Sequence, residues 1–217
     1  MDFDVSHILI RKNRRARHLR LQIDKNGHPV LTVPFLCPQW YALKWAEKQQ
    51  GWIQKHIFRP AVFVPDQNIS VCGRVYTVKH HPEQKGHLIN DTQIVVGGDR
   101  AFFNRRVRDV IKQQFLSSLK IRVQSAAERL GVSYGRITLR DTSSRWGSCS
   151  SGGHLSFCWR IALAPDFVID YLVAHEVSHL RHMNHSPAFW QTVASLTPDI
   201  DRAKRWLKYH AQELRIG

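Results

Sequence analysis

Apolar and polar side chains alternate most regularly between His154 and Ala162. One side of an extended chain would carry the large apolar residues Leu155, Phe157, Trp159, Ile161 and Leu163. The other side would carry His154, Ser156, Cys158 and Arg160. A period of two residues is typical of a β-strand with one buried face. The pattern therefore predicts a strand over residues 154–162.

Other short apolar runs predict further strands, separated by residues that favour turns. We expect strands at residues 7–10, 18–33 and 136–140, and several short ones within 62–96. The run at 18–33 is interrupted by Asp24-Lys25-Asn26-Gly27. This sequence suits the tight turn of a β-hairpin.

Apolar residues at helical spacing predict five helices. They cover residues 38–58, 104–130, a segment that begins at Pro165-Asp166, 187–196 and 199–213. In the first of them, Trp40, Trp45 and Trp52 recur at helical intervals, and we interpret them as core residues. Gly131 directly follows the second helix, as expected for a residue that ends a helix in the left-handed conformation.

These elements predict an α+β fold with two regions. The composition changes at Val96-Gly97-Gly98-Asp99, which is the candidate boundary. We expect residues 1–97 to form a mostly β N-terminal region with one helix. Residues 98–217 would form a second domain with a small sheet and the helices that follow it.

The charge of the chain is unusual for a globular protein. It has 217 residues, of which 32 are Lys or Arg and 17 are Asp or Glu, and the net charge is +15. Such an excess favours binding to polyanions without sequence preference.

The first residues lack the pattern of a signal peptide, and no apolar run approaches the ~20 residues of a membrane span. We therefore expect a cytoplasmic protein without a membrane partner. The scattered cysteines Cys37, Cys72, Cys149 and Cys158 are then expected to be reduced.

Six of the 32 basic residues lie in one short run near the N-terminus. Residues 11–20 contain Arg11, Lys12, Arg14, Arg15, Arg17 and Arg20. A solvated turn and strand face is the ordinary interpretation of this run. The alternative is non-specific binding of nucleic acid or nucleotides at low salt. No motif of a sequence-specific nucleic-acid-binding domain accompanies it.

The candidate chemistry lies in the helix that begins at Pro165-Asp166. At 100° per residue, His175 and His179 continue its apolar stripe and should face the protein interior. One turn apart, the two imidazoles can bind a single zinc ion at about 2.0–2.1 Å. Glu176 would stand beside this ion, which is the H-E-x-x-H arrangement. The metal lowers the pKa of a bound water, and the glutamate takes its proton as the water attacks.

A catalytic zinc site needs a third protein ligand. His182 is on the correct face, but the rise of the helix carries it past the metal. His185 is better placed if the chain reverses between Met183 and Ser186, where Asn184 tolerates the left-handed conformation that stops a helix. Ser186-Pro187 then has the form of a cap and first residue of a new helix. We therefore predict His175, His179 and His185 as metal ligands and Glu176 as the general base.

The segment H-E-V-S-H-L-R-H-M-N-H-S-P-A-F-W resembles the YgjP-like family of predicted zinc metallopeptidases, which are related to the SprT-like and WLM zincins. R-W-G-S-C-S before this segment and T-P-D-I-D-R-A-K-R-W-L after it carry the same resemblance. It implies a zincin-like domain with one zinc ion at His175, His179 and His185, and a protein or peptide substrate. It also extends to proteins proposed to hydrolyse nucleotides. In zincins a strand above the metal helix pairs with the substrate backbone, and residues 154–162 would be that strand.

Several neighbouring residues have open roles. Arg145, His154, Tyr171, Tyr209 and His210 are candidates for stabilising the oxyanion of the transition state. Cys149 could cap the zinc in a latent enzyme, although a small buried residue in a hairpin is the simpler interpretation. Three functions follow from the sequence: a zinc-dependent peptidase, a metal-dependent hydrolase of nucleoside triphosphates, and a binding module that zinc only braces.

Overall fold

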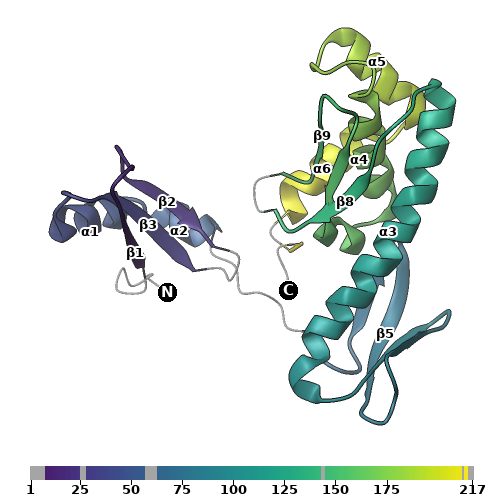
Figure 1. Cartoon of the computed structure of the whole chain (residues 1–217), viewed down its shortest axis with the longest axis horizontal. Helices are drawn as coiled ribbons and strands as arrows, with labels where there is room; N and C mark the ends of the chain where they lie inside the picture. Colours follow the sequence, from purple (N-terminus) through teal and green to yellow (C-terminus); the bar gives the residue numbers. More distant parts are fainter. Residues whose placement is uncertain (1–7, 25–27, 57–62, 143–144, 212, 215–217) are drawn as a thin grey trace. The chain divides into compact units, whose positions relative to one another are not determined.

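The computed structural model describes residues 8–24, 28–56, 63–142, 145–211 and 213–214 (Figure 1). The chain divides into two compact units, Met1–Ala61 and Val62–Arg215, and each has its own hydrophobic core. The predicted boundary at 97/98 differs from this division, because the strands before it pack on the long helix after it. Small sheets combined with helices confirm the predicted α+β class.

A three-stranded sheet forms the centre of the first unit. Its strands are β1 (Leu9–Asn13), β2 (Arg20–Ile23) and β3 (Pro29–Pro34), in the order β1-β3-β2. Strand β3 is parallel to β1 and antiparallel to β2. The antiparallel pair confirms the predicted hairpin, although residues 25–27 of its turn lie outside the described residues.

The helix predicted at 38–58 is two helices, α1 (Gln39–Glu47) and α2 (Gln50–His56), and its last two residues lie outside the described part. Both helices pack on the sheet through small or aliphatic side chains, namely Ala42, Ala46 and Ile53. The interpretation of all three tryptophans as core residues is wrong. Trp40 is 68% exposed and Trp52 is 37% exposed, whereas Trp45 is partly buried. The alanines occupy the face that meets the sheet, so Trp40 falls on the opposite face.

The second unit begins with a four-stranded sheet. Its strands are β4 (Asn68–Val71), β5 (Arg74–His81), β6 (His87–Ile89) and β7 (Gln93–Gly97), in the order β4-β5-β7-β6. They confirm the short strands predicted within 62–96. Val78, Ile94 and Val96 of this sheet are buried in the core of the second unit.

The 3-10 turn η2 (Arg100–Phe102) leads into the long helix α3 (Phe103–Leu130). This helix runs along the four-stranded sheet and along the second sheet of the unit, which follows it in the chain (Figure 1). Its buried residues recur at helical spacing, for example Val107, Ile111 and Phe115. Gly131 ends the helix with a φ of 63°, a conformation that glycine adopts without strain. The predicted helix and its end are confirmed.

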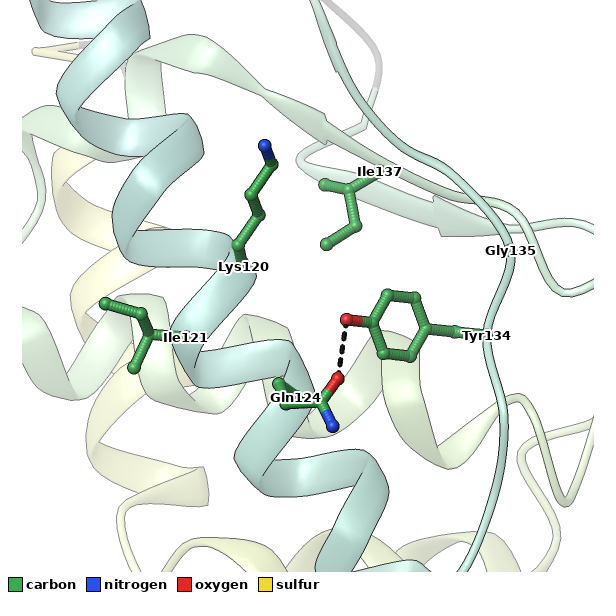
Figure 2. Close-up of a pocket in the computed structure, with 6 residues that line it drawn as sticks. All are labelled: Lys120, Ile121, Gln124, Tyr134, Gly135 and Ile137. Carbon is green, nitrogen blue, oxygen red and sulfur yellow. Dashed lines mark hydrogen bonds between the residues drawn. The ribbon is translucent and has the colours of Figure 1, made fainter.

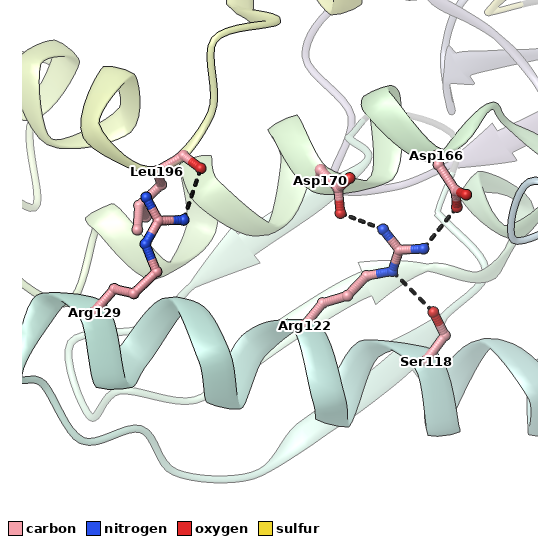
Figure 3. A network of polar contacts seen from close by, with 6 residues as sticks. All are labelled: Ser118, Arg122, Arg129, Asp166, Asp170 and Leu196. Atoms are coloured by element: carbon pink, nitrogen blue, oxygen red, sulfur yellow. Dashed lines mark hydrogen bonds and ion pairs between the residues drawn. The ribbon is translucent and has the colours of Figure 1, made fainter.

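Polar contacts fasten α3 to α4 (Asp166–Ser178) and α5 (Pro187–Leu196) (Figure 3). Arg122 donates to Asp170 and, at 2.6 Å, to Asp166. Arg129 donates to the carbonyl oxygen of Leu196 at 3.0 Å. The guanidinium of Arg122 therefore fixes the first turn of α4, and with it the direction of the helix that carries the predicted site.

The third sheet contains β8 (Ile137–Arg140), β9 (Gly147–Cys149) and β10 (Leu155–Cys158), in the order β8-β10-β9. The predicted strand at 154–162 is wrong beyond Cys158, where the chain enters the 3-10 turn η3 (Trp159–Leu163). Cys158, Trp159 and Arg160 are all buried, which a strand with one buried face does not allow. The buried side chain of Arg160 pairs with Asp141, whose side chain is 45% exposed.

The C-terminal helices follow the prediction closely. Helix α5 has the predicted bounds, and α6 (Ile200–His210) ends three residues before the predicted position 213. Residue 212 lies outside the described residues. None of the helices in the described part of the chain combines the length and apolarity that crossing a membrane requires.

Candidate metal centre

Two of the predicted histidines lie at the end of α4. His175 is in the last turn of the helix, and His179 is its C-terminal cap. Both side chains are half-buried, whereas Val173 and Val177 of the same helix are buried in the core. The two imidazoles therefore stand at the border between the core and the surface.

The chain leaves α4 earlier than the sequence predicts. The helix ends at Ser178 instead of continuing to Met183, and a hydrogen-bonded turn follows His179. Asn184 does not adopt a positive φ, which among the described non-glycine residues occurs at Asp66 and Cys72. The proposed reason for the reversal is therefore wrong. The predicted start of α5 is confirmed, because Ser186 accepts a hydrogen bond from the main-chain N–H of Phe189.

The early end of α4 brings the three predicted ligands together. Nε2 of His175 lies 3.1 Å from Nε2 of His185. The ring centroids of His179 and His185 are 4.9 Å apart. One ring nitrogen of each histidine lies within 4.8 Å of the other two, and among the described residues these three form the group of side chains that could share a metal ion. The ring of His182 is not part of the group.

The hydrogen bonds of the histidines fit a shared metal ion. Nδ1 of His179 lies 3.0 Å from the carbonyl oxygen of His182. A carbonyl can only accept, so Nδ1 carries the hydrogen and Nε2 keeps its lone pair. Ligand nitrogens at about 2.0–2.1 Å from a tetrahedral zinc ion would be ~3.3 Å apart. The 3.1 Å separation between Nε2 of His175 and Nε2 of His185 is close to this value, so these two nitrogens fit such an ion, and a ring nitrogen of His179 lies within 4.8 Å of both.

The protonation of the histidines also suits metal binding. Burial lowers the pKa of His175 to about 4, and the neighbouring charges of His179, His185 and Lys204 act in the same direction. Burial and the charge of His185 also lower the pKa of His179. Neutral imidazole is the form that binds a metal. Because the pKa values of both rings are lowered, neither ring has to lose a proton before it binds a metal at neutral pH.

Glu176 is a buried carboxyl group beside this cluster. It is only 4% exposed, and burial raises its pKa to about 8, although the charge of Arg145 acts in the opposite direction. Its carboxyl group lies against the main chain of β9. A Cβ atom added to Gly147 would come within 2.4 Å of Oε1 of Glu176. Glycine at position 147 therefore leaves the space that the carboxyl group occupies.

An open pocket of about 380 Å³ connects these groups. It is lined by Arg145, Gly147, Ser148, Cys149, His175, Glu176, His179, Met183 and His185. A larger depression of about 480 Å³ lies between α3 and β8 (Figure 2). Of the described residues that line it, Lys120 is the only charged one, and the Tyr134 hydroxyl already donates to Gln124 at 2.9 Å. The smaller pocket is therefore the candidate site.

The strand expected to pair with a substrate is not available for pairing. Strand β10, within the predicted 154–162 segment, lies between β8 and β9 and bonds to both. Strand β9 is an edge of this sheet, and Gly147 and Cys149 of β9 line the pocket. The main-chain N–H of Ser150 donates to His154 on the β10 side at 3.0 Å. In an antiparallel pair, residues whose main-chain groups bond to the partner strand alternate with residues whose groups point outward. Since Ser150 bonds to the β10 side, the main-chain N–H and C=O groups of Gly147 and Cys149 point away from β10.

Two aromatic residues that the sequence did not assign to the site support the histidines. The ring centroid of Phe189 lies 4.9 Å from that of His175, 4.5 Å from that of His179 and 4.8 Å from that of His185. Trp190 stacks on His185 at 5.8 Å. Both belong to the first turn of α5, directly after the cap at Ser186. Phe189 and Trp190 follow His185 by four and five positions, and this short distance in the sequence could have indicated that they lie near the histidines.

The five candidates for oxyanion stabilisation separate in the structure. Arg145 lines the pocket. Tyr171 is buried, and burial, followed by the charge of Glu176, raises its pKa to about 12. His154 bonds to the main-chain N–H of Arg136. Tyr209 is 72% exposed, and His210 pairs with Glu213. Neither of them is among the described residues that line the pocket.

Cys149 and the basic run have defined surroundings. Cys149 lines the pocket, and burial, with a smaller contribution from Glu176, raises the pKa of its thiol. The thiol form is therefore favoured over the thiolate. The six basic residues of positions 11–20 are all exposed and belong to the first unit.

Comparisons with known proteins give one match to a family. The model described as YgjP-like, metallopeptidase domain, matches residues 17–210. Among solved structures, the chain is similar to the metallopeptidase zymogen of Pyrococcus abyssi abylysin, with 20% identity and a TM-score of 0.39. That similarity covers 46% of this chain and 97% of the other. A comparison with curated proteins found no match.

Proposed function

The chain belongs to the YgjP-like metallopeptidase family, and from this premise we propose that it is a zinc-dependent peptidase acting on protein or peptide substrates. The observation that carries the proposal is the convergence of three imidazoles beside a buried carboxyl group in an open pocket. His175, His179 and His185 would hold one zinc ion. Glu176 would act as the general base.

The residues of the pocket divide the work of hydrolysis. A bound zinc ion supplies Lewis acidity and lowers the pKa of a coordinated water molecule. The Glu176 carboxylate accepts a proton from the attacking water and returns it to the leaving amide nitrogen. Burial raises the pKa of Glu176, and the charge of a zinc ion bound beside it would lower that pKa again and so favour the carboxylate form that accepts a proton. Arg145 would stabilise the negative charge that develops on the carbonyl oxygen.

The edge strand β9 supports an extended peptide as the substrate. A peptide main chain can pair with the outward groups of Gly147 and Cys149 and so add a strand to the sheet. Such pairing would place a peptide bond of the substrate over the pocket that the three histidines share. A nucleotide has no main chain to pair with β9, so the geometry favours the peptidase over the nucleotide hydrolase.

Metal removal combined with a substrate screen tests this function. The zinc-loaded protein, the chelated protein and the reloaded protein would each be incubated with an unfolded protein and with a panel of nucleoside triphosphates. We expect proteolysis that is lost on chelation and restored by zinc. Metal-dependent phosphate release without proteolysis would assign the site to phosphate anhydrides instead. Unfolding on chelation, with no turnover of either substrate class, would mean that zinc only braces the fold.

The close approach of Gly147 to Glu176 gives a mutational prediction. We expect Gly147→Ala to lower the rate of peptide hydrolysis at least about tenfold, because the new methyl group must displace the buried carboxyl group. Zinc content should stay at one ion per chain, since the three histidines are not displaced. Hydrolysis rates and metal analysis of the purified variant measure the two effects.

Gly152→Ala in the same hairpin is the matched control. A Cβ atom there meets its nearest neighbours, the His154 ring and Ser150 Oγ, at 3.8–3.9 Å, which is ordinary contact. Its activity should equal that of the parent protein. Equal activity of Gly147→Ala would show that the position of Glu176 does not matter for the reaction.

A further inference from the structure

The outer face of α1 exposes aromatic side chains in the first unit. Trp40 is 68% exposed and Tyr41 is 50% exposed, and their rings are in T-shaped contact at 5.9 Å. Ala42 and Ala46, on the opposite face of the helix, supply its contacts with the sheet. Large exposed aromatic residues at adjacent positions are a feature of binding surfaces more than of solvated helices.

Lysines lie among these rings. Lys44 and Lys48 follow Trp40 at intervals of four residues and therefore continue the same stripe of the helix. Together with Trp45, they and the two exposed aromatic residues line a depression of about 260 Å³. The depression therefore offers flat apolar rings and positive charges within one small area.

The sheet adds a further aromatic residue and a further cation. Strands β1 and β3 are parallel and end together, with Asn13 opposite Pro34. The next residues, Arg14 and Phe35, leave the sheet side by side, and the Arg14 Cζ atom lies 5.0 Å from the Phe35 ring centroid. Phe35 is 48% exposed and belongs to the connection that leads into α1.

Charge over the whole segment is strongly one-sided. Residues 8–56 contain ten Lys and Arg residues but only two carboxylates, Asp24 and Glu47. A surface with this balance attracts polyanions over a distance of about a Debye length, ~8–10 Å at moderate salt. The charge excludes a basic partner and favours a ligand that carries many phosphates.

We propose that this aromatic–basic face binds single-stranded nucleic acid. The face consists of Trp40, Tyr41, Lys44 and Lys48 on α1. Arg14 and Phe35 add a second exposed ring and cation at the connection that leads into this helix. Bases would stack on the exposed rings, while the cations would contact the phosphates between them. A single strand offers free base faces for stacking, whereas a duplex keeps its bases stacked on one another.

The arrangement of the side chains favours nucleic acid over a lipid surface. A helix that lies in a membrane interface separates an apolar face from a charged face. On α1 the tryptophan and the lysines share one stripe instead, as expected when rings and charges must alternate along a strand of bases and phosphates. The inference concerns the first unit alone and does not depend on the metal centre.

Titration of the full chain with a labelled oligothymidylate of about 15 nucleotides tests the inference by fluorescence anisotropy. We expect Trp40→Ala and Tyr41→Ala each to weaken binding at least about fivefold, since stacking on one ring contributes that much or more. Trp40→Phe should retain most of the affinity. Lys44→Ala should reduce the slope of log affinity against log salt by about one.

Tyr209→Ala is the matched control, because Tyr209 is also an exposed tyrosine beside a lysine, with Lys208 Nζ 5.8 Å from its ring. It should leave binding unchanged.

Unchanged binding by Trp40→Ala, or equally tight binding of a duplex, would overturn stacking on this face. Binding of acidic vesicles without binding of the oligonucleotide would assign the face to a membrane. A dimer that Trp40→Ala converts to a monomer would assign it to a second copy of the chain. Because the titration requires neither zinc nor hydrolysis, its result is independent of the peptidase test.

Discussion

Replacement of Glu176 by glutamine is expected to lower the rate of peptide hydrolysis by about 10²- to 10⁴-fold, the contribution that general base catalysis commonly makes. Glutamine has nearly the same shape and can occupy the space beside Gly147, but it cannot accept a proton from water. The three imidazoles are unchanged, so zinc content should stay at one ion per chain. Hydrolysis rates on an unfolded protein and metal analysis of the same sample measure both quantities.

The same substitution at an exposed position is the control for this experiment. Glu128 lies on the surface of α3, where its carboxylate accepts a hydrogen bond from Gln124. Glu128→Gln should therefore cleave at the parental rate. If Glu176→Gln also cleaved at that rate while fully loaded with zinc, the role of Glu176 as the base would be refuted.

Removal of the third histidine is expected to weaken metal binding strongly. His185→Ala should weaken zinc binding by about 100-fold or more, because one of three protein ligands is lost. The side chain is exposed and lies outside the helices, so the circular dichroism spectrum should not change. Competition with a chelator of known affinity measures the loss of binding.

His182 provides the comparison within the same connection. Its main-chain carbonyl, and not its ring, contacts His179, so His182→Ala keeps the group that orients the ligand. We expect this variant to bind zinc as tightly as the parent protein. Loss of zinc from His182→Ala, with full binding by His185→Ala, would exchange the roles assigned to the two residues.

Features that depend on neighbouring residues were predictable from the sequence. Gly131 at the end of α3 and Ser186-Pro187 at the start of α5 act through contacts within one turn of a helix, and both were predicted at the correct position. The convergence of His175, His179 and His185 was also anticipated, because it required only a helix followed by a reversal. Their binding of zinc stays a prediction.

Features that depend on distant residues were not predictable. Arg160 follows the alternation of a strand in sequence, but in the fold it lies in the turn η3, is buried and pairs with Asp141. Phe189 supports three histidines from a different helix, and Gly147 makes room for a side chain that follows it by 29 positions. Trp40 and Ala42 have compatible helical spacing, and only the sheet determines which of them is covered. Each outcome depends on which segments meet in the fold.

The third histidine of the proposed metal site lies in the connection between two helices, so the site depends on both helices being present. Helix α4 alone carries only a pair of imidazoles, and the ring of His185 reaches them because Ser186, Phe189 and Trp190 hold the start of α5 beneath it. A ribosome-bound chain that ends before α5 lacks this support. In the metal site proposed above, the three ligands would therefore come together only after α5 has been synthesised and has packed against α4.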